Sequence, residues 1–288
     1  MTTILSAIVS GAGVLLAGSL PWGVVLAPLN LRIAPVVPWT IVPMTIYLWA
    51  YWGYVGGRLG SPATAAARRQ RLRARAVSPA VWPIAIVAGL IGFGALLTLV
   101  TLMARVMAMP ATPPIQAPPG TPPATMFTLL IMSSVVAGVT EEASFRGYMQ
   151  GAIEQRYGLA AGILVSGTMF GVLHFPNHPN AVLQMLPYYI AVSALYGGLT
   201  WATHSILPAL VMHVGGDVWS LTRLWLTGRP EWQMSSMPPA LIWETGLDAN
   251  FVMTLAALIA LTAVTVALCL SLRRSGAATH ESGPAASG

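Results

Sequence analysis

Long apolar runs, separated by short polar segments, are the main pattern along the chain. Eight of these runs approach or exceed the ~20 apolar residues that a helix needs to cross a bilayer. In lipid each backbone N–H and C=O must be hydrogen-bonded within the segment, so we expect every run to form a helix. The pattern predicts an all-α fold, a polytopic transmembrane helix bundle of about eight spans. We place these spans at residues 4–28, 36–56, 80–108, 125–150, 159–176, 183–202, 205–224 and 250–272.

Composition favours a membrane protein over a soluble one. Of the 288 residues, 56% are hydrophobic and only 8% are charged, whereas soluble domains have about 25% charged residues. The net charge of +6 could indicate a nucleic-acid partner, but six arginines lie in one loop between predicted spans, at residues 58–75. Such a loop is typical of the cytoplasmic side of a membrane protein. We therefore predict membrane lipid as a partner and no nucleic acid.

The arginine-rich loop also predicts the orientation of the chain. Cytoplasmic loops are enriched in Arg and Lys, and counting spans outward from residues 58–75 places both termini in the cytoplasm. Arg273 and Arg274, directly after the last predicted span, then lie on the same side. We expect one transmembrane domain over residues 1–274, in a bacterial cytoplasmic membrane, and a disordered tail over residues 275–288.

Ionisable side chains gather in the predicted spans from residue 125 onward. Such side chains are costly in lipid, and they are functional by default. Glu142 and Arg146 are four residues apart, so they can pair on one helix face. Gly215 and Gly216 permit the close approach of a neighbouring helix. The candidate site residues are Glu141, Glu142, Arg146, His174, His213 and Asp217.

The fourth and fifth predicted spans form a hairpin that turns near Gly158. Glu141 lies 16 residues before residue 157, and His174 lies 16 residues after Gly158. On straight helices the two side chains are therefore at the same height. We expect both to belong to one site.

Three short motifs contain the candidate residues. Residues 141–146 read E-E-x-x-x-R, residues 170–174 read F-x-x-x-H, and residues 213–217 read H-x-x-x-[N/D]. Their order, spacing and placement resemble those of the CAAX prenyl protease and bacteriocin-processing family (CPBP or Abi), intramembrane endopeptidases of the Ras-converting type. The resemblance covers about residues 125–220, which we expect to be the catalytic core.

The resemblance implies peptide-bond hydrolysis by a water molecule that Glu141 activates as general base. It also implies that Glu142 and Arg146 support Glu141, and that His174 holds the water or the oxyanion. The residue types agree with this role, because two histidines can donate hydrogen bonds to a developing oxyanion.

By the same resemblance, His213 and Asp217 supply the remaining polar contacts, and Asp217 stands where asparagine is commoner. An ionised Asp217 only accepts hydrogen bonds, so it would orient His213 or a bound cation. His174, His213 and a carboxylate could instead hold a divalent metal such as zinc, with water as the fourth ligand. The chain has no H-E-x-x-H motif. We favour the metal-independent mechanism and assign no cofactor.

The expected partner is a peptide or protein substrate, either a prenylated CAAX protein or a leader-type peptide. Two other functions remain as alternatives. A proton-coupled transporter needs a relay of Glu, His and Asp side chains, but many such transporters are built from repeats, and the chain shows no internal repeat. A catalytically silent scaffold or self-immunity protein would use the fold only for binding, and the three intact motifs argue against it. The sequence leaves the oligomeric state open.

Overall fold

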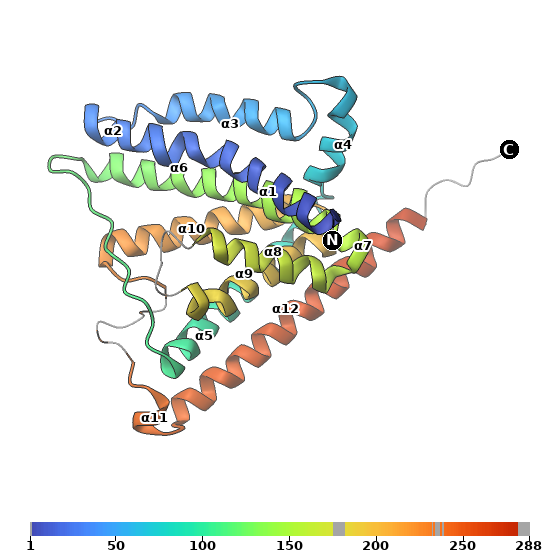
Figure 1. Cartoon of the computed structure of the whole chain (residues 1–288). Helices are drawn as coiled ribbons and strands as arrows, with labels where there is room; N and C mark the ends of the chain where they lie inside the picture. The colour runs from blue at the N-terminus through green and yellow to red at the C-terminus, as the bar shows by residue number, and fades with distance from the viewer. Residues whose placement is uncertain (1, 175–181, 232, 234–236, 238, 282–288) are drawn as a thin grey trace.

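Every regular element in the described part of the chain is a helix, which confirms the predicted all-α class. The structure is a computed structural model. It describes all residues except 1, 175–181, 232, 234–236, 238 and 282–288 (Figure 1).

A helix lies at each of the eight predicted runs. The first four runs overlap α1 (Thr2–Leu20), η1 (Pro21–Leu26), α2 (Ala27–Ile33), α3 (Ile41–Val55), α5 (Val81–Val106), α6 (Pro123–Glu141) and η2 (Glu142–Gln150), and α7 (Gly151–Tyr157) directly follows the fourth run. The last four overlap α8 (Leu159–Leu173), α9 (Val182–Thr203), α10 (Leu207–Thr227) and α12 (Ala249–Glu281). Two short helices that the apolar pattern does not predict lie in loops: α4 (Pro62–Leu72) and α11 (Ile242–Thr245).

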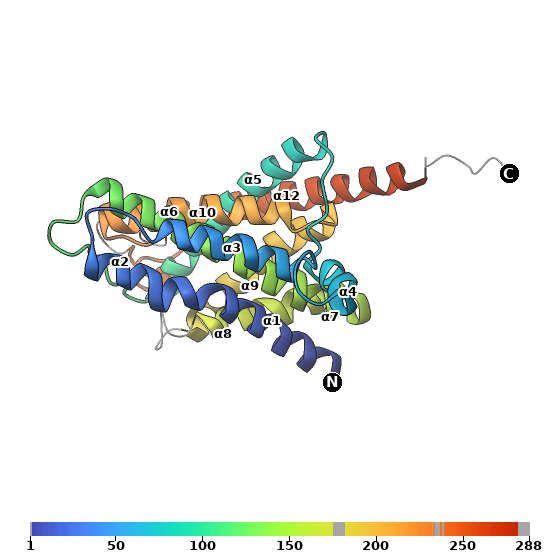
Figure 2. The same ribbon diagram turned by 90° about the horizontal axis from the view of Figure 1, so that it is seen from above.

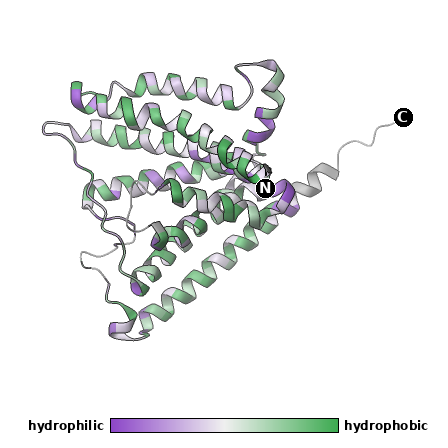
Figure 3. Cartoon of the chain, in the orientation of Figure 1, coloured by the Kyte–Doolittle hydropathy of each residue, from purple (hydrophilic) through white to green (hydrophobic). Residues whose placement is uncertain are grey.

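Among the described residues, four helical stretches are long and apolar enough to cross a membrane: Thr3–Ile33, Val81–Val106, Pro123–Tyr157 and Ala249–Ser275. The chain is therefore an integral membrane protein. α3 and α8 have only 15 residues each, and α9 and α10 are long enough but less apolar. In Figure 3, hydrophobic residues colour most of the long helices, and hydrophilic residues gather at α4 and at helix ends.

The helices that contain the three motifs pack in the middle of the bundle. α6 lies along α10, α8 pairs with α9, and α8 also contacts η2. Figure 2 shows α5 and α12 on one side of the bundle and α1 on the other. This arrangement leaves the motif helices shielded by neighbours, whereas α12 exposes large apolar side chains such as Val252, Met253 and Ile259, as lipid contact requires.

Glycine allows α6 and α10 to approach closely. A Cβ atom on Gly138 would lie only 2.5 Å from Cγ2 of Val214 in α10. Gly216 is also in a close contact, because a Cβ there would lie 3.3 Å from the ring of Phe93. Gly215 faces open space, with no described atom within 4 Å of a Cβ. The expected close approach is therefore found at Gly216 and not at Gly215, which points away from the neighbouring helix.

At the end of the chain, where a disordered tail is expected over residues 275–288, the structure describes residues only up to Glu281. α12 is helical up to Glu281, so residues 275–281 continue the last helix, and residues 282–288 lie outside the described residues. The end of the fifth predicted span, from residue 175, also lies outside them.

Candidate active site

A cavity of about 670 Å3 lies among α5, α6, α8, α9 and α10. Four of the six predicted site residues line it: Glu141, His174, His213 and Asp217. The other two, Glu142 and Arg146, are fully buried behind the cavity wall. The structure therefore brings side chains from all three motifs to one place.

The first motif lies where an α-helix changes to a π-helix. The helix is continuous from Pro123 to Tyr157, and its π-helical segment, η2, covers Glu142–Gln150. All nine residues of η2 are buried. Such turns are rare and frequently lie at functional sites. The apolar pattern predicts only a helix here, because hydrophobic periodicity over so short a stretch does not distinguish the two geometries.

Glu142 connects the first motif to the third. Its Oε1 atom lies 2.7 Å from Nδ1 of His213 and 3.2 Å from Nη1 of Arg146. An ionised carboxylate only accepts hydrogen bonds, so His213 donates its Nδ1–H to Glu142. This bond fixes the orientation of the imidazole and leaves Nε2 pointing at the other carboxylates of the site.

Two carboxylates converge on Nε2 of His213. Oε2 of Glu141 lies 3.5 Å from it, and Oδ2 of Asp217 lies 3.6 Å from it. Both separations exceed those of well-formed direct hydrogen bonds. Polar atoms at such distances can be bridged by a water molecule. The position between Glu141 and His213 is therefore suited to a reacting water.

Arg146 is held by one carboxylate and by aromatic rings. In addition to its ion pair with Glu142, its guanidinium carbon lies 5.2 Å from the ring centre of Phe170 and 5.4 Å from that of Tyr196. Its Nη2 atom lies 3.4 Å from Oγ of Ser193. Ring faces attract cations electrostatically, so the buried charge is compensated on several sides.

His174 lines the cavity, and its ring is held by the backbone and by a neighbouring aromatic side chain. Its Nδ1 lies 2.7 Å from the carbonyl oxygen of Phe170, and a carbonyl can only accept, so Nδ1 carries the proton of that bond. The ring stacks on Tyr189, with ring centres 4.7 Å apart. In the neutral imidazole, Nε2 is then an acceptor that can bind a hydrogen of water.

The described side chains form no metal-binding group. Among the described residues, no group of three or more His, Cys, Asp or Glu side chains is arranged to hold a metal ion. His213 uses Nδ1 for Glu142, and His174 uses Nδ1 for a backbone carbonyl. Each histidine thus has only Nε2 left for the cavity.

Glu231, which the sequence pattern does not single out, also lines the cavity. It lies in the loop after α10 and accepts hydrogen bonds from Ser220 and Tyr188. It escaped notice because it lies outside the predicted spans, where ionisable residues are common. Residues 112, 113 and 115, in the proline-rich loop between α5 and α6, also line the cavity.

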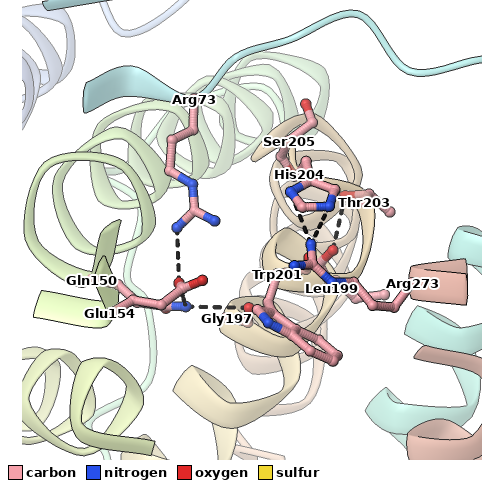
Figure 4. Close-up of polar contacts among 10 residues, drawn as sticks. All are labelled: Arg73, Gln150, Glu154, Gly197, Leu199, Trp201, Thr203, His204, Ser205 and Arg273. Atoms are coloured by element: carbon pink, nitrogen blue, oxygen red, sulfur yellow. Dashed lines mark hydrogen bonds and ion pairs between the residues drawn. The ribbon is translucent and has the colours of Figure 1, made fainter. Parts of the chain in front are cut away.

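The arginine-rich loop, residues 58–75, contacts the helix of the first motif and the start of the helix of the third motif. These contacts lie at the end of the bundle away from the cavity. Nη1 of Arg73 lies 3.0 Å from Oε2 of Glu154 in α7 (Figure 4). The carbonyl of Arg73 accepts a hydrogen bond from the N–H of Ile206, just before α10, at 3.2 Å. This residue therefore connects the helix of the first motif to the helix of the third.

The turn between α9 and α10 lies beside that connection. Figure 4 shows Arg273 of α12 against the ring of His204, where its Nη1 contacts both ring nitrogens and lies 3.2 Å from the carbonyl oxygen of Trp201. Desolvation and, secondarily, the charge of Arg273 lower the pKa of His204. Arg273 thus fastens the last helix to this turn while His204 is neutral.

Comparison with known families agrees with the motifs. Residues 123–219 match the family described as type II CAAX prenyl endopeptidase, Rce1-like. The match contains all six candidate residues and covers the segment from α6 to most of α10, about a third of the chain. No curated protein and no solved structure matches the chain.

Proposed function

We propose that this chain, whose residues 123–219 form a domain of the type II CAAX prenyl endopeptidase family, is an intramembrane endopeptidase that uses glutamate-activated water. The main support is the convergence of Glu141 and Asp217 on Nε2 of His213 inside one cavity. A water molecule between these groups has a carboxylate to accept its proton. The cavity also gives a peptide bond room to approach.

In the proposed reaction, Glu141 removes a proton from water while the oxygen attacks the carbonyl carbon of the scissile bond. Nε2 of His174 accepts the other hydrogen of the water and so orients it. His213, when it has both ring protons, donates Nε2–H to the oxyanion of the tetrahedral intermediate. Glu141 then gives its proton to the leaving amine as the C–N bond breaks. No step uses a metal ion.

Glu142, Arg146 and Asp217 have supporting roles in this proposal. Glu142 fixes His213 through Nδ1, and Arg146 pairs with Glu142 and keeps it in place. Asp217, which accepts but does not donate when ionised, holds the Nε2–H of His213 between substrates. An asparagine at this position would instead offer a donor.

We also propose an orientation with eight spans and both termini in the cytoplasm of a bacterial cell. Arg58, Arg69, Arg71 and Arg75 are exposed at the α4 end, and cytoplasmic loops are enriched in such residues. Figure 1 shows the loop between α5 and α6 at the opposite end. Since that loop lines the cavity, the cavity would open toward the outer face. This favours a substrate whose scissile bond is reached from that side over a cytoplasmic prenylated C-terminus.

Cleavage by the purified protein in liposomes tests the proposed function. The substrates are a panel of leader-type and prenylated CAAX peptides, and each variant is measured with and without chelator. We expect Glu141→Gln to abolish cleavage, because the amide cannot accept the proton of water. Glu244→Gln, which changes an exposed carboxylate outside the catalytic cavity, is the matched control and should cleave like wild type.

Three outcomes would change the proposal. Cleavage that survives Glu141→Gln would remove Glu141 as the base. Loss of cleavage in chelator that zinc restores would replace the metal-free mechanism. Absence of cleavage by folded wild-type protein over the whole panel would favour a silent scaffold or a transporter.

A further inference from the structure

Glu231 is fixed in the cavity wall by neutral donors only. Its Oε2 accepts a hydrogen bond from Oγ of Ser220 at 2.9 Å, and its Oε1 accepts one from the hydroxyl of Tyr188 at 3.3 Å. None of the ion pairs found among the described residues involves Glu231. An ionised Glu231 is therefore held in a defined place with its charge uncompensated.

The rest of the cavity wall does not supply the missing positive charge. Glu141, Asp217 and Glu231 all line the cavity, and no arginine is among its described lining residues. The first two carboxylates share His213 as a partner, whereas Glu231 has no basic partner there. A cation that enters this cavity gains more Coulomb energy than it would in water, because the walls exclude solvent.

The distance from Glu231 to the reacting groups follows from α10. Ser220, which holds Glu231, is seven residues after His213, so the two lie two turns apart, about 10 Å along the helix. An extended peptide advances about 3.3 Å per residue. Glu231 is therefore about three substrate residues from the bond that lies beside His213.

We infer that Glu231 is a specificity-determining residue that selects a substrate with lysine or arginine about three residues from the scissile bond. The inference rests on the proposed endopeptidase function and adds the charge of the substrate to it. The apolar stem of such a side chain packs on the aromatic wall formed by Tyr188 and Trp219, with its charged end at Glu231.

A purely structural role for Glu231 would be to fasten the loop after α10 to α9 and α10. The two roles respond differently to substitution. Glu231→Gln keeps an oxygen that can accept a hydrogen bond and removes the charge. Ser220→Ala removes one of the two hydrogen bonds and keeps the charge. If Glu231 selects charge, Glu231→Gln loses the preference for a lysine substrate and Ser220→Ala keeps it.

The test measures kcat/KM for a peptide that the wild type cleaves, with one lysine moved through the five positions on either side of the scissile bond. Each lysine peptide is compared with its glutamine and glutamate counterparts at the same position. The enzymes are wild type, Glu231→Gln, Glu231→Lys, Ser220→Ala and the control Glu244→Gln, all in liposomes of one composition. Thermal unfolding of each variant verifies that it is folded.

We expect wild type to prefer lysine over glutamine by roughly tenfold or more at a position about three residues from the bond, as one charged hydrogen bond contributes. Glu231→Gln should lose that preference and keep its rate on the glutamine peptide. Glu231→Lys should prefer glutamate at the same position, and the control Glu244→Gln should behave like wild type. Ser220→Ala, which removes one hydrogen bond to Glu231 but keeps its charge, should keep most of the lysine preference.

Each contrary result has a distinct meaning. A wild-type enzyme that cleaves but shows no preference for lysine at any position overturns the inference and leaves the proposed function intact. A preference that Glu231→Gln retains, or that Ser220→Ala loses to the same extent, also overturns it. Absence of cleavage of every peptide by folded wild-type protein overturns the proposed function and the inference together.

Discussion

Glu142 and Arg146 form an ion pair from which water is excluded. Both side chains have 0% exposed surface, and Oε1 lies 3.2 Å from Nη1. Removal of one partner leaves the other charge buried and unpaired, which costs about 3–5 kcal/mol. We therefore expect Glu142→Gln and Arg146→Met each to lower Tm by roughly 6–20 °C, at about 2–4 °C per kcal/mol for a chain of this size.

The double variant should be less damaged than the sum of the two single variants. With both charges absent, the site contains neutral groups of similar volume, and replacing a buried pair in this way is often nearly neutral. A double-mutant cycle measures this coupling directly. Thermal unfolding in detergent, followed by tryptophan fluorescence, gives Tm for wild type, both single variants and the double variant. Glu244→Gln is the control, because its side chain is exposed.

The same variants separate stability from catalysis. Glu142→Gln also weakens the charge-assisted bond to His213, and such bonds contribute about 1.5–3 kcal/mol. If that energy is used in the transition state, kcat falls by roughly 10- to 150-fold. Additive losses of Tm in the double variant would refute the coupled pair. A folded Glu142→Gln with the wild-type kcat would refute the orienting role of Glu142.

Three other predictions follow from single contacts. Gly138→Ala should lower both Tm and cleavage, because its new methyl group meets Val214 and overpacking of this kind costs about 1–3 kcal/mol. Gly215→Ala is the matched control, because Gly215 faces open space. Equal losses of Tm in the two variants would contradict the reasoning. His174→Gln should lower kcat with little change in Tm, because in the proposed reaction His174 orients the water at the cavity surface. Unchanged peptide cleavage would exclude that role. The lowered pKa of His204 means that the unfolded chain binds its proton more readily, so stability should fall as pH drops below about 6.5. His204→Asn, which tolerates the left-handed backbone at φ 55°, should flatten Tm measured between pH 5 and 7, and an unaltered slope would assign the effect to other groups.

The position of the helices could be predicted well because lipid imposes one requirement on every span. All backbone groups must be bonded within the segment, so the apolar runs at residues 80–108 and 250–272 could only form helices. Which residues pack between helices was harder to predict from the sequence. Gly215 and Gly216 are neighbours in the sequence, yet only Gly216 packs closely, and this depends on how far α10 is rotated toward Phe93.

The meeting of the three motifs was also predictable, but not the pairing of their atoms. Equal helix height placed Glu141 near His174, and both line the cavity. The bond between Glu142 and Nδ1 of His213 was unexpected, because it depends on the π-helical geometry that follows Glu141. Glu231 was missed because a carboxylate in a loop carries no free-energy cost of burial in an apolar span. Nothing in the sequence therefore distinguishes it from other loop carboxylates.

The π-helical segment also limits how the sequence of this domain can change in length. An α-helix becomes π-helical where it accommodates an extra residue, so a single-residue deletion within Glu142–Gln150 would let this stretch return to ordinary α geometry while the flanking turns stay in phase. The helix would be kept, but side chains within the segment, Glu142 and Arg146 among them, would shift relative to His213 and the aromatic rings. Under the proposed function, a relative that has lost one residue here should therefore retain the fold and lose cleavage, even with every motif letter present. A one-residue gap at this place in an alignment would then predict loss of that activity better than the motif letters alone.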